Sequence, residues 1–366
     1  MQYENEGQKM HTETHTSSAC RYDMEALTAA VLELFLKAGL PAPMARDVVA
    51  SLIYADAIGH STHGLAIAPW YLEEIASGSF NVSGSHDVIS DRGACVAWRG
   101  NRLAGAWLIN RAIDLCLERI DRHGVVTVTI GEGYHTGALA TYLPRLTERG
   151  LLVILACSGP AAQGVAPFGG TRGVFTPNPL AAGIPTHADP VLLDISCSIT
   201  TIKRSAQMAE AGCTFDADWL LDENGTPSRD PNVLIGGQGT LMPVGGLDHG
   251  HKGYSMALLV EALTQGLSGT GRRQKLDGTV MNTFLQVIDP EAFGGRREFA
   301  DEMDWLVESC RANPPRQGVV RVRVPGDQAR SRLEQARMQG VALDRSIVDR
   351  LKPCFARFGM VLPEAR

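Results

Sequence analysis

The chain has 366 residues, of which 44% are hydrophobic and 20% are charged, and its formal net charge is −6. A chain of this length and apolar content can bury a core without cross-links, as one large domain or two. Because neither sign of charge dominates, nothing favours a nucleic-acid partner or an anionic membrane surface. We therefore expect a small-molecule substrate and partners that are other protein chains.

The eight cysteines are scattered without a Cys-x-x-Cys pair, which argues against a thiolate zinc site and against a disulfide framework. Residues 1–20 are polar and lack the apolar stretch of a signal peptide, so we expect a flexible tail there. No run approaches the roughly 18 apolar residues that span a bilayer. These features favour reduced thiols and a cytoplasmic protein.

The first third of the chain is rich in predicted helices. Apolar residues recur at helical spacing from Asp23 to Gly39, and further helices are expected from Pro43 to Ala57 and from Ala104 to His123. Short apolar runs at 124–130, 150–158 and 190–196 then have the pattern of buried strands. The glycine- and proline-rich segment between the last two, 158–185, is long for a plain connection, which favours a functional role.

The rest of the chain returns to helices. A strongly apolar helix over 253–269 is expected to be buried on most sides, and a helix is expected near 298–313. A strand-like run at 318–326 and two closing helices follow. We expect a helix-rich discontinuous domain, 21–124 plus 290–366, around a cofactor-binding sheet domain, 125–289.

The common nucleotide-binding, metalloprotease and serine-hydrolase motifs are absent, so chemistry must come from looser groups. Four groups stand out in the sequence: GHSTHG at 59–64, EGYHTGA at 132–138, LDISCS at 193–198 and GLDHGHKGYS at 246–255. The last places Lys252 at a predicted helix start, where an ammonium and free amides favour a phosphate.

Each group also has a plain structural alternative. A histidine near a strand end is commonly a hydrogen-bonded structural residue, Lys252 can be a solvated surface residue, and Asp194 can simply cap a turn. His60 and His63 have helical spacing for a metal, but no third ligand is evident nearby, so we expect no metal site.

Eight segments in a consistent order resemble one known family over nearly the whole chain. They are ADAIGHSTHGLAIAPWY, HTGALATY, VAPFGG, NPLAAGIP, LDISCS, GHKGYSMALLVEALTQGLSG, IDPEAFG and VRVPG. The chain resembles the malate/L-lactate dehydrogenase family of NAD(P)-dependent oxidoreductases, which includes ureidoglycolate dehydrogenase and Δ1-piperideine-2-carboxylate/Δ1-pyrroline-2-carboxylate reductases. The resemblance implies a non-Rossmann α/β (α+β) fold, in which helices flank a mixed, largely antiparallel sheet, and a homodimer.

The resemblance also implies roles for individual residues. His135 would exchange a proton with the substrate, a role that suits an imidazole near neutral pH, and His63 would line the same cavity beside the hydroxyl of Thr62. Asp194 would orient a catalytic group or bind the cofactor, and these two roles stay open. The implied contacts of NADP or NAD are Ser158, Phe168, Gly169, Gly170, Asp194, Ile195, Ser196, His251, Lys252 and Gly253.

The chain departs from the family pattern around the expected substrate. The family arginine that grips the substrate carboxylate is replaced by Ile67, which removes a contact of about 1.5 to 3 kcal/mol per charge-assisted bond. Tyr134 adds bulk beside His135, and Lys203-Arg204 replace a Gly-Lys pair. Arg172 and Arg204 are the candidates for supplying the missing charge.

We therefore expect a reductase or dehydrogenase that transfers hydride to the C=N or C=O group of a specialised substrate whose carboxylate is absent, amidated or tethered, as in a step of secondary metabolism. An ordinary 2-hydroxy acid dehydrogenase or cyclic imino acid reductase is the alternative. A non-catalytic homologue retained for binding is the third possibility.

Overall fold

The structure is a computed structural model and describes residues 19–366, so nearly all of the expected tail at 1–20 lies outside the described residues. The helices are α1 Met24–Lys37, α2 Ala42–Ile58, α3 Ala68–Ser77, α4 Gly105–His123, α5 Pro144–Thr147, α6 Ile202–Glu210, α7 Gly246–His249, α8 His251–Glu261, α9 Arg296–Arg311, α10 Asp327–Gln339 and α11 Arg345–Arg357. The strands are β1 Cys20–Tyr22, β2 Asp87–Asp91, β3 Cys95–Arg99, β4 Val125–Gly133, β5 Leu152–Ser158, β6 Leu180–Ile184, β7 Val191–Ile195, β8 Leu220–Leu221, β9 Pro227–Ser228, β10 Thr240–Leu241, β11 Met281–Ile288 and β12 Val341–Leu343.

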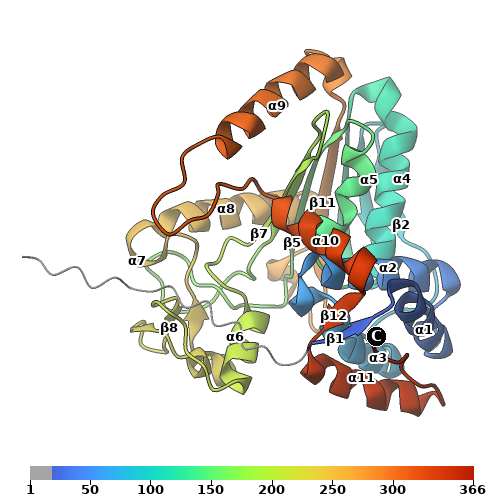
Figure 1. The fold of residues 1–366 in the computed structure, drawn as a ribbon, viewed down its shortest axis with the longest axis vertical. Coiled ribbons are helices and arrows are strands. Elements are labelled where there is room, and N and C mark those ends of the chain that lie inside the picture. Colours follow the sequence, from blue (N-terminus) through green and yellow to red (C-terminus); the bar gives the residue numbers. More distant parts are fainter. Residues whose placement is uncertain (1–18) are drawn as a thin grey trace, which may run out of the picture.

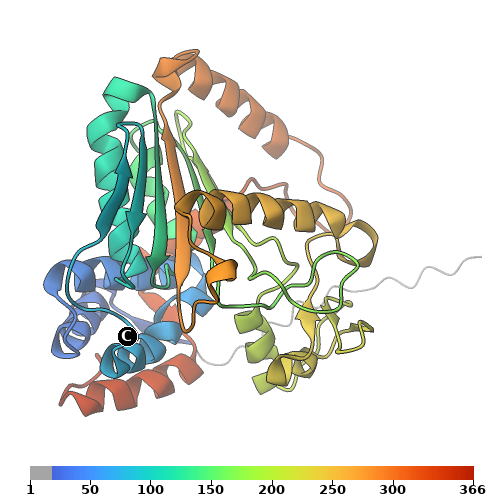
Figure 2. The same ribbon diagram turned by 180° about the vertical axis from the view of Figure 1, so that it is seen from behind.

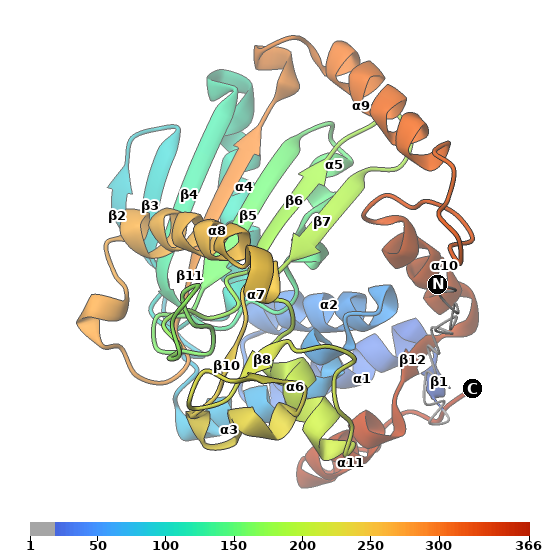
Figure 3. The ribbon, with the colours of Figure 1, turned by 90° about the vertical axis from the view of Figure 1, so that its left-hand side faces the viewer.

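A seven-stranded sheet forms the centre of the molecule, with the order β2-β3-β4-β11-β5-β6-β7 (Figure 3). Only the β3–β4 pair is parallel, so the sheet is mixed and largely antiparallel, as expected. Helices α4 and α5 cover one face, and α8 crosses the other (Figures 2 and 3). The sheet is buried by helices on both sides, which explains the continuous apolar runs of β4 and β5.

The two ends of the chain meet in a helical layer beside the sheet. Strand β1 pairs antiparallel with β12, and helices α1, α2, α3, α10 and α11 gather around this pair (Figure 1). Their apolar faces join the sheet in one core that includes Phe35, Leu52 and Phe355, each at most 1% exposed. A second, smaller core lies under α8 and includes Phe175, Phe215 and Phe284.

The expected helices in the first third and the expected strands at 124–130, 150–158 and 190–196 are all present. The sheet crosses the expected domain boundary at 124/125, because β2 and β3 pair with β4. The division into two domains therefore stays a proposal. No helix among residues 19–366 is long and apolar enough to cross a bilayer.

Two expectations are wrong. The expected strand at 318–326 is irregular, and its only ladder-like contact is the hydrogen bond from the Leu192 amide to Pro325 O. The expected helix at 253–269 is not buried on most sides, because α8 packs through one side only; Leu258 is 47% exposed and Leu259 is 55% exposed. This helix also changes to a π-helical turn at Ala262–Gly266.

Candidate active site

His135 lies in the segment that follows β4, where it contacts α3. Its Nδ1 lies 2.6 Å from the hydroxyl of Tyr71, which is 3% exposed, and its ring meets Trp70 edge-on at 5.3 Å between centroids. The amide of Gly137 also donates to Nδ1, over 3.3 Å. Tyr71 and Gly137 occupy Nδ1, which leaves Nε2 as the nitrogen for proton exchange.

His63 lies parallel to His135. The ring planes differ by 9° and the centroids are 5.9 Å apart, while Nδ1 of His63 lies 2.9 Å from the hydroxyl of Thr62. Burial lowers the pKa of His63 to about 4 and lowers the pKa of His135 well below its ordinary value. Nearby positive charge adds to both shifts, so both rings are neutral at pH 7. The structure thus brings the predicted residues Thr62, His63 and His135 together.

A buried carboxylate fixes the turn that carries His63. Asp56, in α2, accepts a hydrogen bond of 2.7 Å from the amide of Leu65. A Cβ atom on Gly64 would overlap the carboxyl group of Asp56, so any larger residue there would force that side chain or the turn to shift. Burial raises the pKa of Asp56 to about 7. The sequence GHSTHG therefore ends in a glycine because the chain passes directly over this carboxyl group.

Two residues predicted to contact substrate lie deeper than expected. Tyr134 is fully buried; its hydroxyl donates to Glu74 over 2.8 Å, and its ring stacks on Phe80 at 4.4 Å, behind Tyr71. Ile67 is 2% exposed and belongs to the main core. Their contact with substrate stays a prediction.

Asp194, at the end of β7, ties the loop after His135 to the sheet edge. Its Oδ2 accepts from the amide of Ala140 over 2.8 Å and lies 3.9 Å from Nδ1 of His60. Burial raises the pKa of Asp194. These contacts favour an orienting role for its carboxylate, and the residue also borders a large cavity.

That cavity has a volume of about 770 Å³ and lies between α2, β7 and α10. His60, Asp194 and Ile195 line it, together with Pro325, Gly326 and four arginines: Arg323, Arg330, Arg332 and Arg337. His63 and His135 are outside its lining, although His60 is in the same short segment as His63.

The other predicted cofactor residues form a second group at the start of α8. Phe168 meets the ring of His251 at 5.8 Å, and Gly169 and Gly170 follow it in the same turn. A Cβ atom on Gly253 would lie 2.6 Å from the carbonyl oxygen of Cys197, so the helix start packs directly on the chain that leaves β7 through Ser196. Lys252 is exposed here and can reach a phosphate. The amide of Gly253 already donates to Val244 O, so it is one donor fewer for the phosphate site expected at this helix start.

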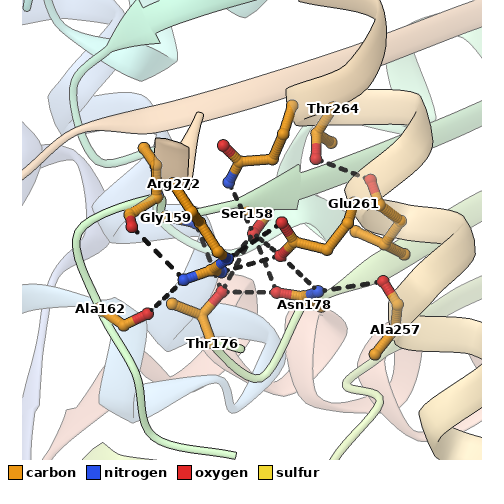
Figure 4. A network of polar contacts seen from close by, with 12 residues as sticks. Ser158, Gly159, Ala162, Thr176, Asn178, Ala257, Glu261, Thr264 and Arg272 are labelled. Carbon is orange, nitrogen blue, oxygen red and sulfur yellow. Dashed lines mark hydrogen bonds and ion pairs between the residues drawn. The ribbon is translucent and has the colours of Figure 1, made fainter. Parts of the chain in front are cut away.

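Ser158 lies elsewhere, in a buried polar network under α8 (Figure 4). Its hydroxyl is 2.7 Å from Glu261 Oε1 and 2.9 Å from Asn178 Oδ1. Arg272 forms a two-pronged ion pair with Glu261 and donates to the carbonyl oxygen of Ala162. The network joins the loop after β5 to α8, and Ser158 serves this connection; its contact with the cofactor stays a prediction.

Within residues 19–366, no group of three or more histidine, cysteine or acidic side chains is placed to hold a metal ion. Tyr71 and Trp70 both belong to the segment ADAIGHSTHGLAIAPWY, but no local pattern marks them as site residues. Lys203 was noted only as a departure from the family, yet its ammonium lies 4.7 Å from the centroid of the Trp70 ring.

The chain is similar to known proteins over most of its length. The sequence profile of malate/L-lactate dehydrogenase matches residues 22–352. An L-sulfolactate dehydrogenase of Methanothermobacter thermautotrophicus is 26% identical over 314 residues, covering 83% of this chain and 88% of that protein. An L-lactate dehydrogenase of Cupriavidus necator is 30% identical over 306 residues, covering 81% and 86%.

The solved structure of malate dehydrogenase from Pyrococcus horikoshii OT3 has a TM-score of 0.85 to this chain at 25% identity, covering 94% of this chain and 97% of that one. The fold and the profile match therefore lead to one conclusion. The chain belongs to the malate/L-lactate dehydrogenase family and is an oxidoreductase.

Proposed function

We propose that the protein is an NAD(P)-dependent oxidoreductase that interconverts a small 2-hydroxy acid and its 2-oxo acid. The observation that carries the proposal is the pair of neutral imidazoles, His63 and His135, with Nδ1 of His135 held by Tyr71. Two relatives are named as dehydrogenases of L-sulfolactate and L-lactate, and these names support the same substrate class.

His135 handles the proton in this proposal. Because burial lowers its pKa well below the usual 6.5, the ring is a neutral base at pH 7. When the alcohol is oxidised, the imidazole takes the hydroxyl proton while hydride leaves the same carbon; when the ketone is reduced, the protonated ring returns it. Tyr71 keeps the ring oriented in both directions.

The chemistry around the 770 Å³ cavity suits a dinucleotide. Arg330 is paired with Asp189, which leaves the guanidinium groups of Arg323, Arg332 and Arg337 to complement phosphates, although Glu148 and Glu334 also line the cavity. The carboxylate of Asp194 can accept from a hydroxyl. The volume also falls within the usual range of ligand sites, about 300 to 1,000 Å³. Bound NAD or NADP would supply or accept the hydride. Asp194, Ile195 and the backbone at Gly326 are the residues we expect to hold it there, with the α8 group as the second contact region.

The test uses His135→Gln in the full chain with its cofactor. We expect kcat for 2-oxo acid reduction to fall by about 10² to 10⁴, while reduced dinucleotide still binds with unchanged affinity by fluorescence titration. A His123→Gln variant, changed at the end of α4, serves as control. Equal kcat for wild type and His135→Gln would disprove the assignment.

A second candidate is a reductase of an imine or ketone without a free carboxylate, in secondary metabolism. The observation favouring it is Ile67, a 2% exposed aliphatic residue where the resemblance implies an arginine. Comparing turnover of pyruvate, pyruvamide and Δ1-piperideine-2-carboxylate separates the candidates. A preference for pyruvamide would favour the second one, and failure to bind any dinucleotide would favour a non-catalytic homologue.

We also propose a homodimer. The outer side of α8 exposes Leu258 and Leu259, and Leu267 follows at 57% exposure, a row of apolar side chains that a second copy would cover. Light scattering should give twice the chain mass for wild type. A Leu258→Glu, Leu259→Glu variant should shift toward the monomer, whereas Leu36→Glu, at an exposed leucine of α1, should not.

A further inference from the structure

Lys203 places a positive charge at the aromatic wall of the site. It is the second residue of α6, and its ammonium lies 4.7 Å from the centroid of the Trp70 ring. The same indole meets His135 edge-on at 5.3 Å, and His135 lies parallel to His63. One aromatic ring therefore contacts both the ammonium and the ring that handles the proton.

The Lys203 ammonium lacks a carboxylate partner within the described part of the chain. Among residues 19–366, no carboxylate forms an ion pair with it; its pKa is lowered, first by burial and then by the guanidinium of Arg350 in α11. Its contact with the indole face fixes its position without neutralising its charge. Within the described residues, no carboxylate offsets this charge, which favours an anion at the same place.

The other candidate cations do not act on the histidines. Lys203 is a charge that lowers the pKa of both His63 and His135, whereas Arg172 and Arg204 contribute to neither. Arg204 follows Lys203 on α6, and both side chains are exposed, but only the ammonium of Lys203 is placed over the Trp70 ring. Ile67 supplies no charge. Lys203 is thus the cation of this site that can replace the arginine missing at Ile67.

We propose that Lys203, held over Trp70, binds the carboxylate of the substrate and so orients the reactive carbon toward His135. This inference rests on the proposed function, since it names how that site holds its acid. The carboxylate would offset the charge of Lys203, which otherwise opposes protonation of His135. An anionic substrate would therefore favour the protonated imidazole that ketone reduction requires.

The experiment measures binding of unreactive acids to the full chain saturated with reduced dinucleotide. The probes are oxamate, tartronate and sulfoacetate, with neutral oxamide as the control ligand, and heat of binding is the readout. Lys203→Met removes the charge and keeps the apolar stem, Lys203→Arg keeps the charge, and Arg204→Met removes the neighbouring charge on the same helix. Thermal unfolding of each variant confirms folding.

We expect Lys203→Met to weaken binding of at least one acid by about 10- to 100-fold, the range of one charge-assisted hydrogen bond. Arg204→Met should stay within about twofold of wild type, Lys203→Arg should recover most of the affinity, and oxamide should be unaffected. In turnover of pyruvate, KM should rise more than kcat falls. A merely structural Lys203 would change none of these differences between acid and amide.

Equal affinities in Lys203→Met and Arg204→Met would overturn the inference, and so would wild type that binds none of the three acids. The proposed function fails separately. If no 2-oxo acid is reduced but acid binding still depends on Lys203, the anion site stands and the proposed reaction is wrong. If pyruvate is reduced with the same KM in wild type and Lys203→Met, the reaction stands and the anion site is wrong.

Discussion

The Tyr71 hydroxyl lies 2.6 Å from Nδ1 of His135, and this contact joins α3 to the segment that follows β4. Tyr71 is 3% exposed, and burial raises its pKa well above the ordinary value, so the phenol is neutral at pH 7. The contact sets the direction of the imidazole without adding charge. The orientation of His135 therefore depends on how α3 packs.

Replacing Tyr71 by Phe should lower kcat by about 5- to 10-fold, the equivalent of one hydrogen bond of roughly 1 kcal/mol. The ring would keep its packing but lose the partner that holds Nδ1. Steady-state kinetics checks this, with Tyr22→Phe in the β1–β12 pair as control. Unchanged kcat would show that the Gly137 amide is a sufficient partner for the imidazole.

The stability of the protein should depend on the titration of His63. Its pKa is about 4 when folded and about 6.5 when unfolded, so the unfolded chain binds more protons between these values. The contribution of the neutral His63 ring to the free energy of unfolding is therefore fully present above pH 6.5 and is lost as the pH falls toward 4. In His63→Gln, the slope of unfolding free energy against pH should be smaller by up to about 1.4 kcal/mol per unit in this window. Urea titrations at pH 4.5, 5.5 and 6.5 measure it; identical slopes would contradict it.

Arg272 should matter for stability more than its sequence position suggests. Its side chain is 19% exposed and its partner Glu261 is 15% exposed, so loss of the arginine leaves a largely buried carboxylate unpaired. We expect Arg272→Met to lower the free energy of unfolding by roughly 3 kcal/mol. The neighbouring exposed residue provides the control, Arg273→Met. The double variant Arg272→Met, Glu261→Gln should recover part of the loss.

Gly64→Ala tests the close approach to Asp56. The added Cβ would meet the carboxyl group at 2.1 Å, and the resulting shift should cost about 1 to 3 kcal/mol of stability and displace His63. Gly294→Ala is the matched control, because nothing lies within 4 Å of a Cβ there. Equal melting temperatures for the two variants would mean that the turn relaxes freely.

Local patterns predicted much of the fold. Helical spacing gave α1, α2, α4 and α9, and apolar runs gave β4, β5 and β7, because these segments bury one stripe or both faces. The exposure of Leu258 and Leu259 was missed because an apolar helix face has the same pattern whether the same chain or another copy covers it. The prediction of a strand at 318–326 was wrong for a similar reason. Alternation of valine and arginine indicates an extended chain but does not show whether a neighbouring strand is available for hydrogen bonding.

Part of the candidate site, namely which residues lie close together, could be predicted from the sequence. His63, Thr62 and His135 are brought together as expected. The roles of Tyr71 and Lys203 depend on which helices pack beside His135. No short sequence pattern indicates which helices pack together, so these roles could not be predicted. The buried network around Ser158 was not predictable, because its partner Glu261 lies about a hundred residues further along the chain.

The position of β11 has a consequence for biosynthesis. This strand, Met281–Ile288, fits between β4 and β5, which are encoded more than a hundred residues earlier, and it pairs with both. The gap between those two strands cannot close until the ribosome has passed residue 288. During much of its synthesis the nascent chain therefore exposes the apolar, unpaired edges of β4 and β5. Binding of a chaperone would protect it from aggregation most in that interval.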